Sequence, residues 1–245
     1  MEDLLQTIRY LKTRAKNRRD LGRYESAVKI LREEAVPLIQ TELASTTLAD
    51  WKVQLASELS DGFGIMGGIY RRWGLESETE QERILHLGES VNAYEKGYEL
   101  ERNPEYNIAN SYNMVNRLVS YILLEPASLS DASTAESSSA NISYDVRLEL
   151  NRAESVVRDQ LKEKRRGDIW ALADLALISL LLDSSDPITA YADFIAKSPP
   201  SFAYESVLST LRPMAILSLP VGDKLREAVR LLEAELMQLY SSASV

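Results

Sequence analysis

The stretch LSDGFGIMGGIYRRWG (59–74) is followed by a charged insert, ESETEQER (76–83), and then by SVNAYEKGYELERNPEYNIANSYNMVNRLVSYILL (90–124). Glycine and other small residues occur where two helices would touch. An aromatic-rich helix follows, with Asn103-Pro104 as its stop signal, and a further helix comes after it. This order is typical of a helical repeat, so the stretch predicts a fold of stacked helical hairpins.

The composition of the 245-residue chain also indicates a helical protein. Hydrophobic residues make up 45% of the sequence and charged residues 27%, as in a folded globular chain. Ten Gly and eight Pro are few for a protein built of tight β-turns, and no segment alternates as a strand would. The fold class that we expect is therefore all-α, with about ten helices.

Neither a targeting segment nor a membrane span is predicted. The sequence starts with acidic, amphipathic residues, unlike a signal peptide. The longest apolar run, residues 169–182, contains Asp174 and is too short to cross a bilayer. The absence of cysteine excludes a disulfide scaffold and a thiolate metal site. We expect a cytoplasmic protein without a membrane partner.

Charge is distributed unevenly along the chain. The net charge is −9, and general nucleic-acid binding requires a cationic surface that such a protein lacks, so no nucleic-acid partner is expected. Residues 1–23 nevertheless carry seven basic and three acidic side chains. This first segment is thus about +4, and the remainder of the chain is about −13.

The hydrophobic spacing predicts two helical parts joined by a linker. The N-terminal part is expected to hold three repeat-like units, the first of which begins with an amphipathic helix. The C-terminal part is expected to end in a capping helix with leucines at spacings of four and three. Between the two parts lies a Ser-rich segment that is typical of a loop or linker. The expected parts are residues 1–124, 125–141 and 142–245.

Prolines and caps set the expected helix boundaries. Pro37 is expected to kink or end the second helix, because proline has no N–H group to donate. After the Asn103-Pro104 stop, the next helix is expected over about residues 105–124. Asp168 and Asp186-Pro187 indicate helix starts, and Pro213 is expected to kink a later helix.

The segment LGRYESAVKIL (21–31) resembles the turn and second helix of a tetratricopeptide repeat. In that repeat a glycine closes the first helix, a tyrosine packs in the turn and an alanine lets the two helices approach. Gly22, Tyr24 and Ala27 match these three positions. The resemblance implies an α-solenoid, that is, a stack of helical hairpins.

Residues 60–217 together resemble a narrower family, the tetratricopeptide-type "TRAFs-binding" domain of apoptosis-signal-regulating kinases and its bacterial relatives. The resemblance implies a regulatory module that holds other proteins. The Ser-rich segment and Pro213 depart from the family's pattern. The matching residues are Gly67, Tyr70, Tyr94, Gly97, Tyr98, Tyr106, Asn110, Trp170 to Ala173 and Ser209 to Arg212.

No motif predicts catalysis, a metal site or a cofactor. Residues 62–67 spell G-x-G-x-x-G, but a dinucleotide site needs a preceding strand, and the residues before it are helical. His86 is the only histidine and is interpreted as a partly exposed residue near a helix start. Glu99, Glu101 and Glu105 are candidates for an acid–base pair, but charged residues around a helix end are usually solvated. We expect a protein that is not an enzyme.

The basic first helix is the strongest candidate for partner binding, because four of its cations lie along one side. These side chains face acidic residues of the same chain, an acidic protein partner or nucleic acid, and the spacing leaves these alternatives open. Aromatic residues of the repeats mostly pack, with one or two expected to be exposed for a peptide. The predicted partner-binding residues are Lys12, Lys16, Arg19, Arg23, Arg71 and Tyr112.

Two functional hypotheses follow. The first is a non-enzymatic scaffold or regulatory subunit that binds another protein or a peptide and controls a signalling or defence effector. The second is a helical-repeat sensor that binds a small peptide or nucleotide signal. The sequence identifies neither the partner nor the oligomeric state.

Overall fold

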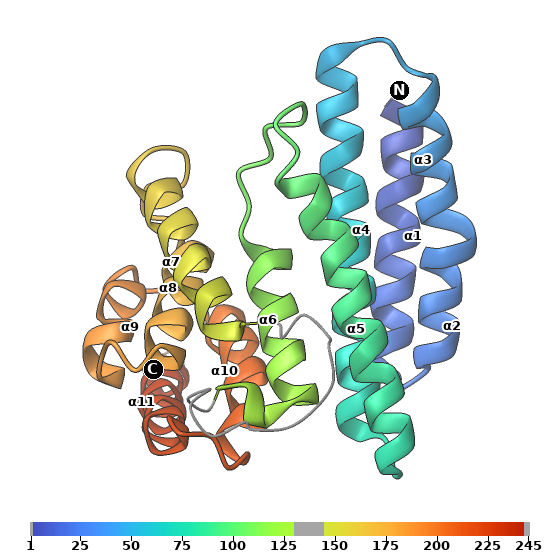
Figure 1. Ribbon diagram of the computed structural model, residues 1–245. Coiled ribbons are helices and arrows are strands. Elements are labelled where there is room, and N and C mark those ends of the chain that lie inside the picture. Colours follow the sequence, from blue (N-terminus) through green and yellow to red (C-terminus); the bar gives the residue numbers. More distant parts are fainter. Residues whose placement is uncertain (1, 130–144, 243–245) are drawn as a thin grey trace. The chain divides into compact units, whose positions relative to one another are not determined.

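The computed structural model describes residues 2–129 and 145–242, and all regular structure within these residues is helical (Figure 1). The chain forms two compact units, Met1–Leu124 and Glu125–Val245. Helices α2 and α3 are joined by a π-helical segment into one helix, so the eleven α-helical segments make ten continuous helices in the described residues. None of these is long and apolar enough to cross a membrane.

Unit 1 is a stack of antiparallel helices. Helix α4 runs antiparallel to α5 and to the helix over residues 24–45, which lie on either side of it (Figure 1). The most extensive packing in the unit is between α4 and α5, followed by that between α5 and α6. The elements are α1 (Glu2–Asp20), α2 (Tyr24–Lys29), η1 (Ile30–Ala35), α3 (Val36–Ser45), α4 (Ala49–Glu76), α5 (Glu80–Glu101) and α6 (Tyr112–Leu124).

The first turn has the features that a tetratricopeptide repeat implies. Gly22 has a φ of +69°, a left-handed conformation that glycine adopts readily. The N–H groups of Gly22 and Arg23 donate to the carbonyls of Arg19 and Arg18, each at 2.9 Å, and so close α1. Tyr24 and Ala27 are both buried immediately after the turn. The local interpretation of this segment is confirmed.

Pro37 does not end the second helix, although an end at this residue was one of the two outcomes that the sequence predicted. The helix continues to Ser45, because the segment before the proline is π-helical. The N–H of Val36 donates to the carbonyl of Leu31, five residues earlier. This wider spacing accommodates a residue that has no N–H to offer. The π-helical segment, Ile30–Ala35, thus keeps the helix continuous through a proline.

Helix α6 begins later than predicted. It starts at Tyr112 rather than near Glu105, and residues 102–111 form an irregular connection. Asn107 has a φ of +49°, which an α-helix cannot contain, and the side chain of Asn110 accepts a hydrogen bond from the N–H of Tyr112 at 3.1 Å. Asparagines at these two positions therefore favour a loop and a helix cap over another turn of helix.

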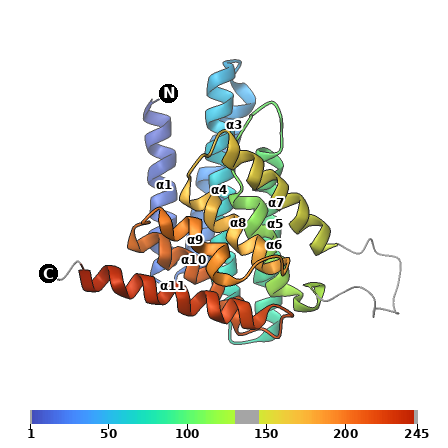
Figure 2. The same cartoon turned by 90° about the vertical axis from the view of Figure 1, so that its left-hand side faces the viewer.

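Unit 2 is a second group of packed helices. Helix α11 lies beside α10 in both views (Figures 1 and 2). The aspartate side chains that precede α7, α8 and α9 accept hydrogen bonds from backbone N–H groups and so cap these helices. Pro213 lies inside α10, which ends two residues later. The elements are η2 (Pro126–Leu129), α7 (Val146–Lys162), α8 (Ile169–Leu181), α9 (Pro187–Ala196), α10 (Ser201–Ala215) and α11 (Gly222–Ser242).

The predicted linker is in part regular structure. Residues 126–129 form a short 3-10 helix, and Leu129 is buried. This leucine is therefore an apolar anchor within the predicted linker. The remainder of the predicted linker, residues 130–141, lies outside the described residues.

Candidate functional site

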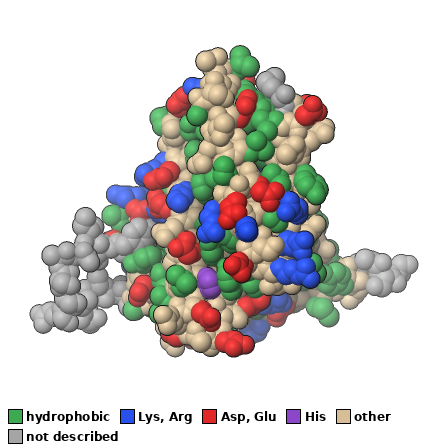
Figure 3. Space-filling model, turned by 90° about the vertical axis from the view of Figure 1, so that its right-hand side faces the viewer, with side chains coloured by type: hydrophobic (Ala, Val, Ile, Leu, Met, Phe, Trp, Pro, Cys, Tyr) green, Lys and Arg blue, Asp and Glu red, His purple; other side chains and the backbone are tan. Residues whose placement is uncertain are grey.

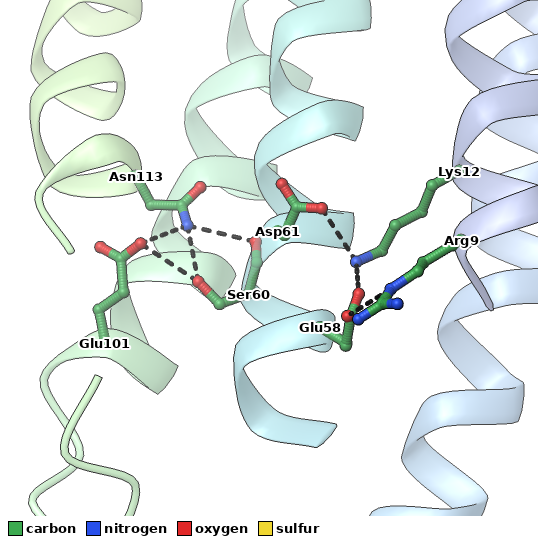
Figure 4. Close-up of polar contacts among 7 residues, drawn as sticks. All are labelled: Arg9, Lys12, Glu58, Ser60, Asp61, Glu101 and Asn113. Atoms are coloured by element: carbon green, nitrogen blue, oxygen red, sulfur yellow. Dashed lines mark hydrogen bonds and ion pairs between the residues drawn. The ribbon is translucent and has the colours of Figure 1, made fainter. Parts of the chain in front are cut away.

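Lys12 does not belong to an exposed basic face. Only 4% of the residue is exposed, and its Nζ donates to Glu58 and, at 2.9 Å, to Oδ2 of Asp61, both on α4 (Figure 4). Lys12 follows the buried Ile8 by four residues, so it lies on the side of α1 that packs against the unit. The long side chain of Lys12 extends from this packed side of α1, and its ammonium group reaches the carboxylates of Glu58 and Asp61.

The other predicted cations of this end of the chain are only partly available. The guanidinium of Arg19 donates to Asp20 at 2.9 Å. Lys16 and Arg23 are exposed and have no ion pair among the described residues. Lys12 and Arg19 thus face acidic residues of the same chain, one of the alternatives that the sequence left open, whereas partner binding at Lys16 and Arg23 stays a prediction.

Arg71 and Tyr112 lie where α4 meets α6. Nη1 of Arg71 donates to Oδ1 of Asn116 at 2.6 Å, and the ring of Tyr112 packs against the backbone of Gly64. Tyr112 is 40% exposed as a residue, but its hydroxyl end is enclosed, and burial raises the pKa of that hydroxyl well above its usual value. Both side chains support the packing of these two helices.

A buried polar network joins α4, α5 and α6 (Figure 4). Nδ2 of Asn113 donates to Oε1 of Glu101 at 2.7 Å and to Oγ of Ser60 at 2.9 Å, and Ser60 in turn donates to Glu101 at 3.2 Å. Glu101 is therefore buried, not solvated as its position near a helix end predicts. The carboxylate serves as a hydrogen-bond acceptor that fixes neighbouring helices.

His86 is also more buried than expected. Only 9% of it is exposed, and its ring stacks on Trp73 with the centroids 3.8 Å apart and an interplanar angle of 19°. Burial lowers the pKa of His86, although Glu82 and Glu89 act in the opposite direction. The described residues contain no cluster of His, Cys, Asp and Glu side chains that could hold a metal ion.

The cavity that stands out in unit 1 is a groove of about 630 Å³ between the helix over residues 24–45 and α5. We call it the α4 groove, because α4 forms its floor. The turn after α5 closes one end. It is lined by Arg32, Val36, Pro37, Gln40, Leu59, Phe63, Met66, Tyr70, Glu89, Asn92, Ala93, Lys96, Glu99, Leu100, Asn103 and Tyr106.

The floor of the α4 groove is apolar and aromatic. Phe63, Met66 and Tyr70 are spaced by three and four residues, so they follow one side of α4. Burial, and then the nearby charge of Glu89, raise the pKa of the Tyr70 hydroxyl. This residue therefore stays a neutral hydrogen-bonding group at the bottom of the groove near neutral pH.

The walls of the groove are charged. Glu89, Lys96 and Glu99 are exposed on α5 and have no hydrogen bond or ion pair in the described residues. Nζ of Lys96 lies 6.0 Å from the centroid of the Phe63 ring on the floor. On the face of the protein that Figure 3 shows, acidic and basic side chains are intermixed. The groove thus combines an apolar floor with walls that carry both signs of charge.

Of the aromatic residues that the sequence suggested for a groove, two line the α4 groove, Tyr70 and Tyr106, and four do not, Trp73, Tyr94, Tyr98 and Tyr112. Among the charged wall residues of α5, the sequence pointed only to Glu99. Glu89, Lys96 and Glu99 are seven and three residues apart, a spacing that places them on one helical stripe. This spacing could have indicated a charged stripe along α5. Nothing in the sequence shows, however, that the helix opposite it stands far enough away to leave a groove.

The stacked antiparallel hairpins and their glycine-closed turn define unit 1 as a helical-repeat domain of the tetratricopeptide type. Residues 2–121 match a family model described as "Tetratricopeptide Repeats-Sensor", which covers nearly all of this unit. The match supports a tetratricopeptide-type family, and the narrower resemblance to "TRAFs-binding" domains stays a prediction. Comparisons with curated proteins and with solved structures find no match.

Proposed function

We propose that this chain is a non-enzymatic binding protein that holds a segment of a partner protein in the α4 groove. The observation that carries the proposal is the set of charged α5 side chains, without hydrogen bonds or ion pairs in the described residues, above an apolar floor. These side chains are exposed, so a ligand of opposite charge can pair with them without first breaking an ion pair within the chain.

Binding is favoured over catalysis by what the buried titratable groups do. His86 packs on Trp73, and Glu101 accepts hydrogen bonds from Ser60 and Asn113. Neither group lines the α4 groove. The polar groups that do line it, carboxylates, a lysine, an arginine and amides, are suited to recognising charge and peptide backbone.

A regulatory role follows from the resemblance to domains that hold other proteins. We propose that the bound partner is a signalling or defence effector whose activity changes when the groove is occupied. This step rests on analogy at the level of the family. The acidic net charge of −9 is consistent with a protein partner rather than nucleic acid.

A matched pair of variants tests the proposal. Asn92 is exposed on the groove wall, so Asn92→Trp fills the groove without entering the core. Thr13→Trp places the same side chain on an exposed position of α1, outside the groove. We expect a partner captured by the wild type to be retained by Thr13→Trp and lost with Asn92→Trp. Equal capture by all three proteins would contradict binding in the groove.

A second candidate function is that of a small-ligand sensor. The description of the matching family as a sensor favours it, as does the π-helical segment that forms part of one groove wall, because π-helical turns are frequent at functional sites. Native mass spectrometry of the purified chain distinguishes the two. A stoichiometric small molecule that Asn92→Trp no longer carries would favour the sensor over the partner-binding protein.

A further inference from the structure

We infer that the ligand of the α4 groove is a short extended peptide in which an acidic side chain and an apolar side chain stand two positions apart. This inference rests on the proposed function and specifies its partner. The acidic side chain would pair with Lys96, and the apolar one would lie on Phe63. The argument uses the length of the groove, the position of Lys96 and the two carboxylates beside it.

The length of the groove fits about five extended residues. Its floor runs along α4 from Leu59 to Tyr70. At about 1.5 Å per residue in a helix, this span is about 16 Å. An extended chain covers about 3.3 Å per residue, so about five residues fill the floor from end to end. A helix of the same length would need about eleven residues, which is too bulky for a groove of about 630 Å³.

The position of Lys96 sets the pattern of the peptide. Its Nζ lies 6.0 Å from the centroid of the Phe63 ring. In an extended chain, side chains two residues apart point the same way and are about 6.6 Å apart. A carboxylate at one such position therefore reaches Lys96 while an apolar side chain at the other reaches Phe63. Adjacent residues would point in opposite directions and could not do both.

Two carboxylates restrict the rest of the ligand. Glu89 and Glu99 stand seven residues before and three residues after Lys96 on α5, which places them about 10 Å and about 5 Å away along the helix axis. Neither has a hydrogen bond or an ion pair in the described residues. Further negative charge next to Lys96 would be repelled by these two carboxylates. The second cation of the lining, Arg32, lies on the opposite wall and has Glu33 as an ion-pair partner at 3.8 Å. Along α5 the groove therefore favours one acid at Lys96 with neutral or basic neighbours.

A selection experiment on the full chain tests the inference. A library of random seven-residue peptides displayed on phage is selected against wild type, Lys96→Glu and Lys16→Glu. Lys16 is a matched control, because it is exposed and without an ion pair in the described residues but lies outside the groove. We expect wild type and Lys16→Glu to enrich the same acidic-x-apolar pattern, and Lys96→Glu to enrich a basic residue at the acidic position.

Affinities of one enriched peptide give the quantitative check. Lys96→Glu should weaken binding about five- to tenfold, and a peptide with lysine in place of its acid should recover most of that loss. If the enriched peptides are blocked by Asn92→Trp but carry no acid that responds to Lys96→Glu, the inference fails and groove binding stands. If enrichment is unchanged by Asn92→Trp, the proposed function fails as well. Preferential binding of ATP, lost in Lys96→Glu, would also overturn the inference.

Discussion

Tyr94 is fully buried between α4 and α5, and carbons of its ring lie 2.7 Å and 2.8 Å from the position that a Cβ atom on Gly67 would occupy. Real Cβ atoms do not approach another heavy atom so closely, so glycine is required here. A glycine within a helix costs up to about 1 kcal/mol relative to alanine. The packing of the large Tyr94 ring stabilises the contact by more than the glycine costs the helix, which accounts for glycine at position 67.

Gly67→Ala should therefore lower the free energy of unfolding by about 1–3 kcal/mol, because the added methyl group overpacks the contact. Gly88→Ala is the matched control, since Gly88 lies in α5 with no heavy atom within 4 Å of its Cβ position. That change should raise stability by up to about 1 kcal/mol. Urea unfolding followed by circular dichroism measures both. Similar midpoints for the two variants would show that α4 and α5 are not packed this closely.

Lys12 provides a second prediction at this scale. Removing its ammonium group leaves Glu58 with only the more exposed Arg9, whose Nε lies 3.6 Å from Oε1, while Asp61 is half exposed and less affected. Lys12→Ala should reduce stability by about 1–3 kcal/mol, whereas Lys16→Ala should change it by less than about 0.5 kcal/mol. Thermal or urea melts of the two variants make the comparison. Equal stability would mean that Lys12 is a surface residue after all.

Among the elements, α4 and α5 are joined by an aromatic stack as well as by glycine contacts. Trp73 stacks on His86 and also lies near Tyr24 and Tyr70, with ring centroids 6.0 Å and 6.3 Å away. His86 is the only histidine in the chain. Any change in stability that this residue causes between pH 5 and 7 can therefore be isolated by a single substitution.

The stack should be weakened by mild acid. Burial lowers the pKa of His86 in the folded protein below its usual 6.5, so the unfolded chain binds the proton more readily. Stability is then full above pH 6.5 and declines as the pH falls toward the lowered value. His86→Phe keeps an aromatic ring on Trp73 and removes the proton site. Chemical unfolding at pH 7.5 and 5.5 should show a smaller loss in the variant than in the wild type. An equal loss would exclude His86 as the cause.

The elements also show what sequence patterns can predict. The helix starts predicted at Asp168 and Asp186 are confirmed. They could be predicted because each cap involves only backbone N–H groups within the next turn of the same helix. The expected end of the helix at Pro37 is not observed, because the π-helical segment before it packs through buried residues and keeps the helix continuous. The spacing of residues in the sequence does not reveal such a segment. The α4 groove was missed for a related reason. A groove exists only because two helices, distant in sequence, do not touch, and no local pattern encodes such a gap.

At the scale of the whole molecule, the chain consists of two compact units that meet in sequence at Leu124 and Glu125. Each unit has its own buried core: Leu55 and Ile69 are fully buried in the first, and Phe194 and Leu208 in the second. A unit with its own core can fold independently of its neighbour. The matching family covers residues 2–121, which agrees with unit 1 as a separate module.

Limited proteolysis should therefore separate unit 1 from the helices α7–α11 of unit 2. Leu129 is buried, so we expect the first cut on its C-terminal side, within the Ser-rich residues 130–141. Mass spectrometry of the fragments locates the cut, and circular dichroism shows whether the N-terminal fragment stays helical. This fragment should bind groove peptides as the full chain does. A first cut inside a helix of unit 1, or an unfolded fragment, would contradict the independence of the two units.

The hydrogen bonds among Ser60, Glu101 and Asn113 join the hairpin of α4 and α5 to the next helix, α6. In a modular array, one repeat can replace another because every junction is alike. Here the junction depends on an amide that fits only beside Gly97, where a Cβ atom would lie 2.5 Å from the Cγ of Asn113. Anyone who shortens, extends or recombines this array would therefore have to transfer α4, α5 and α6 as a single cassette, with new boundaries before Ala49 or after Leu124.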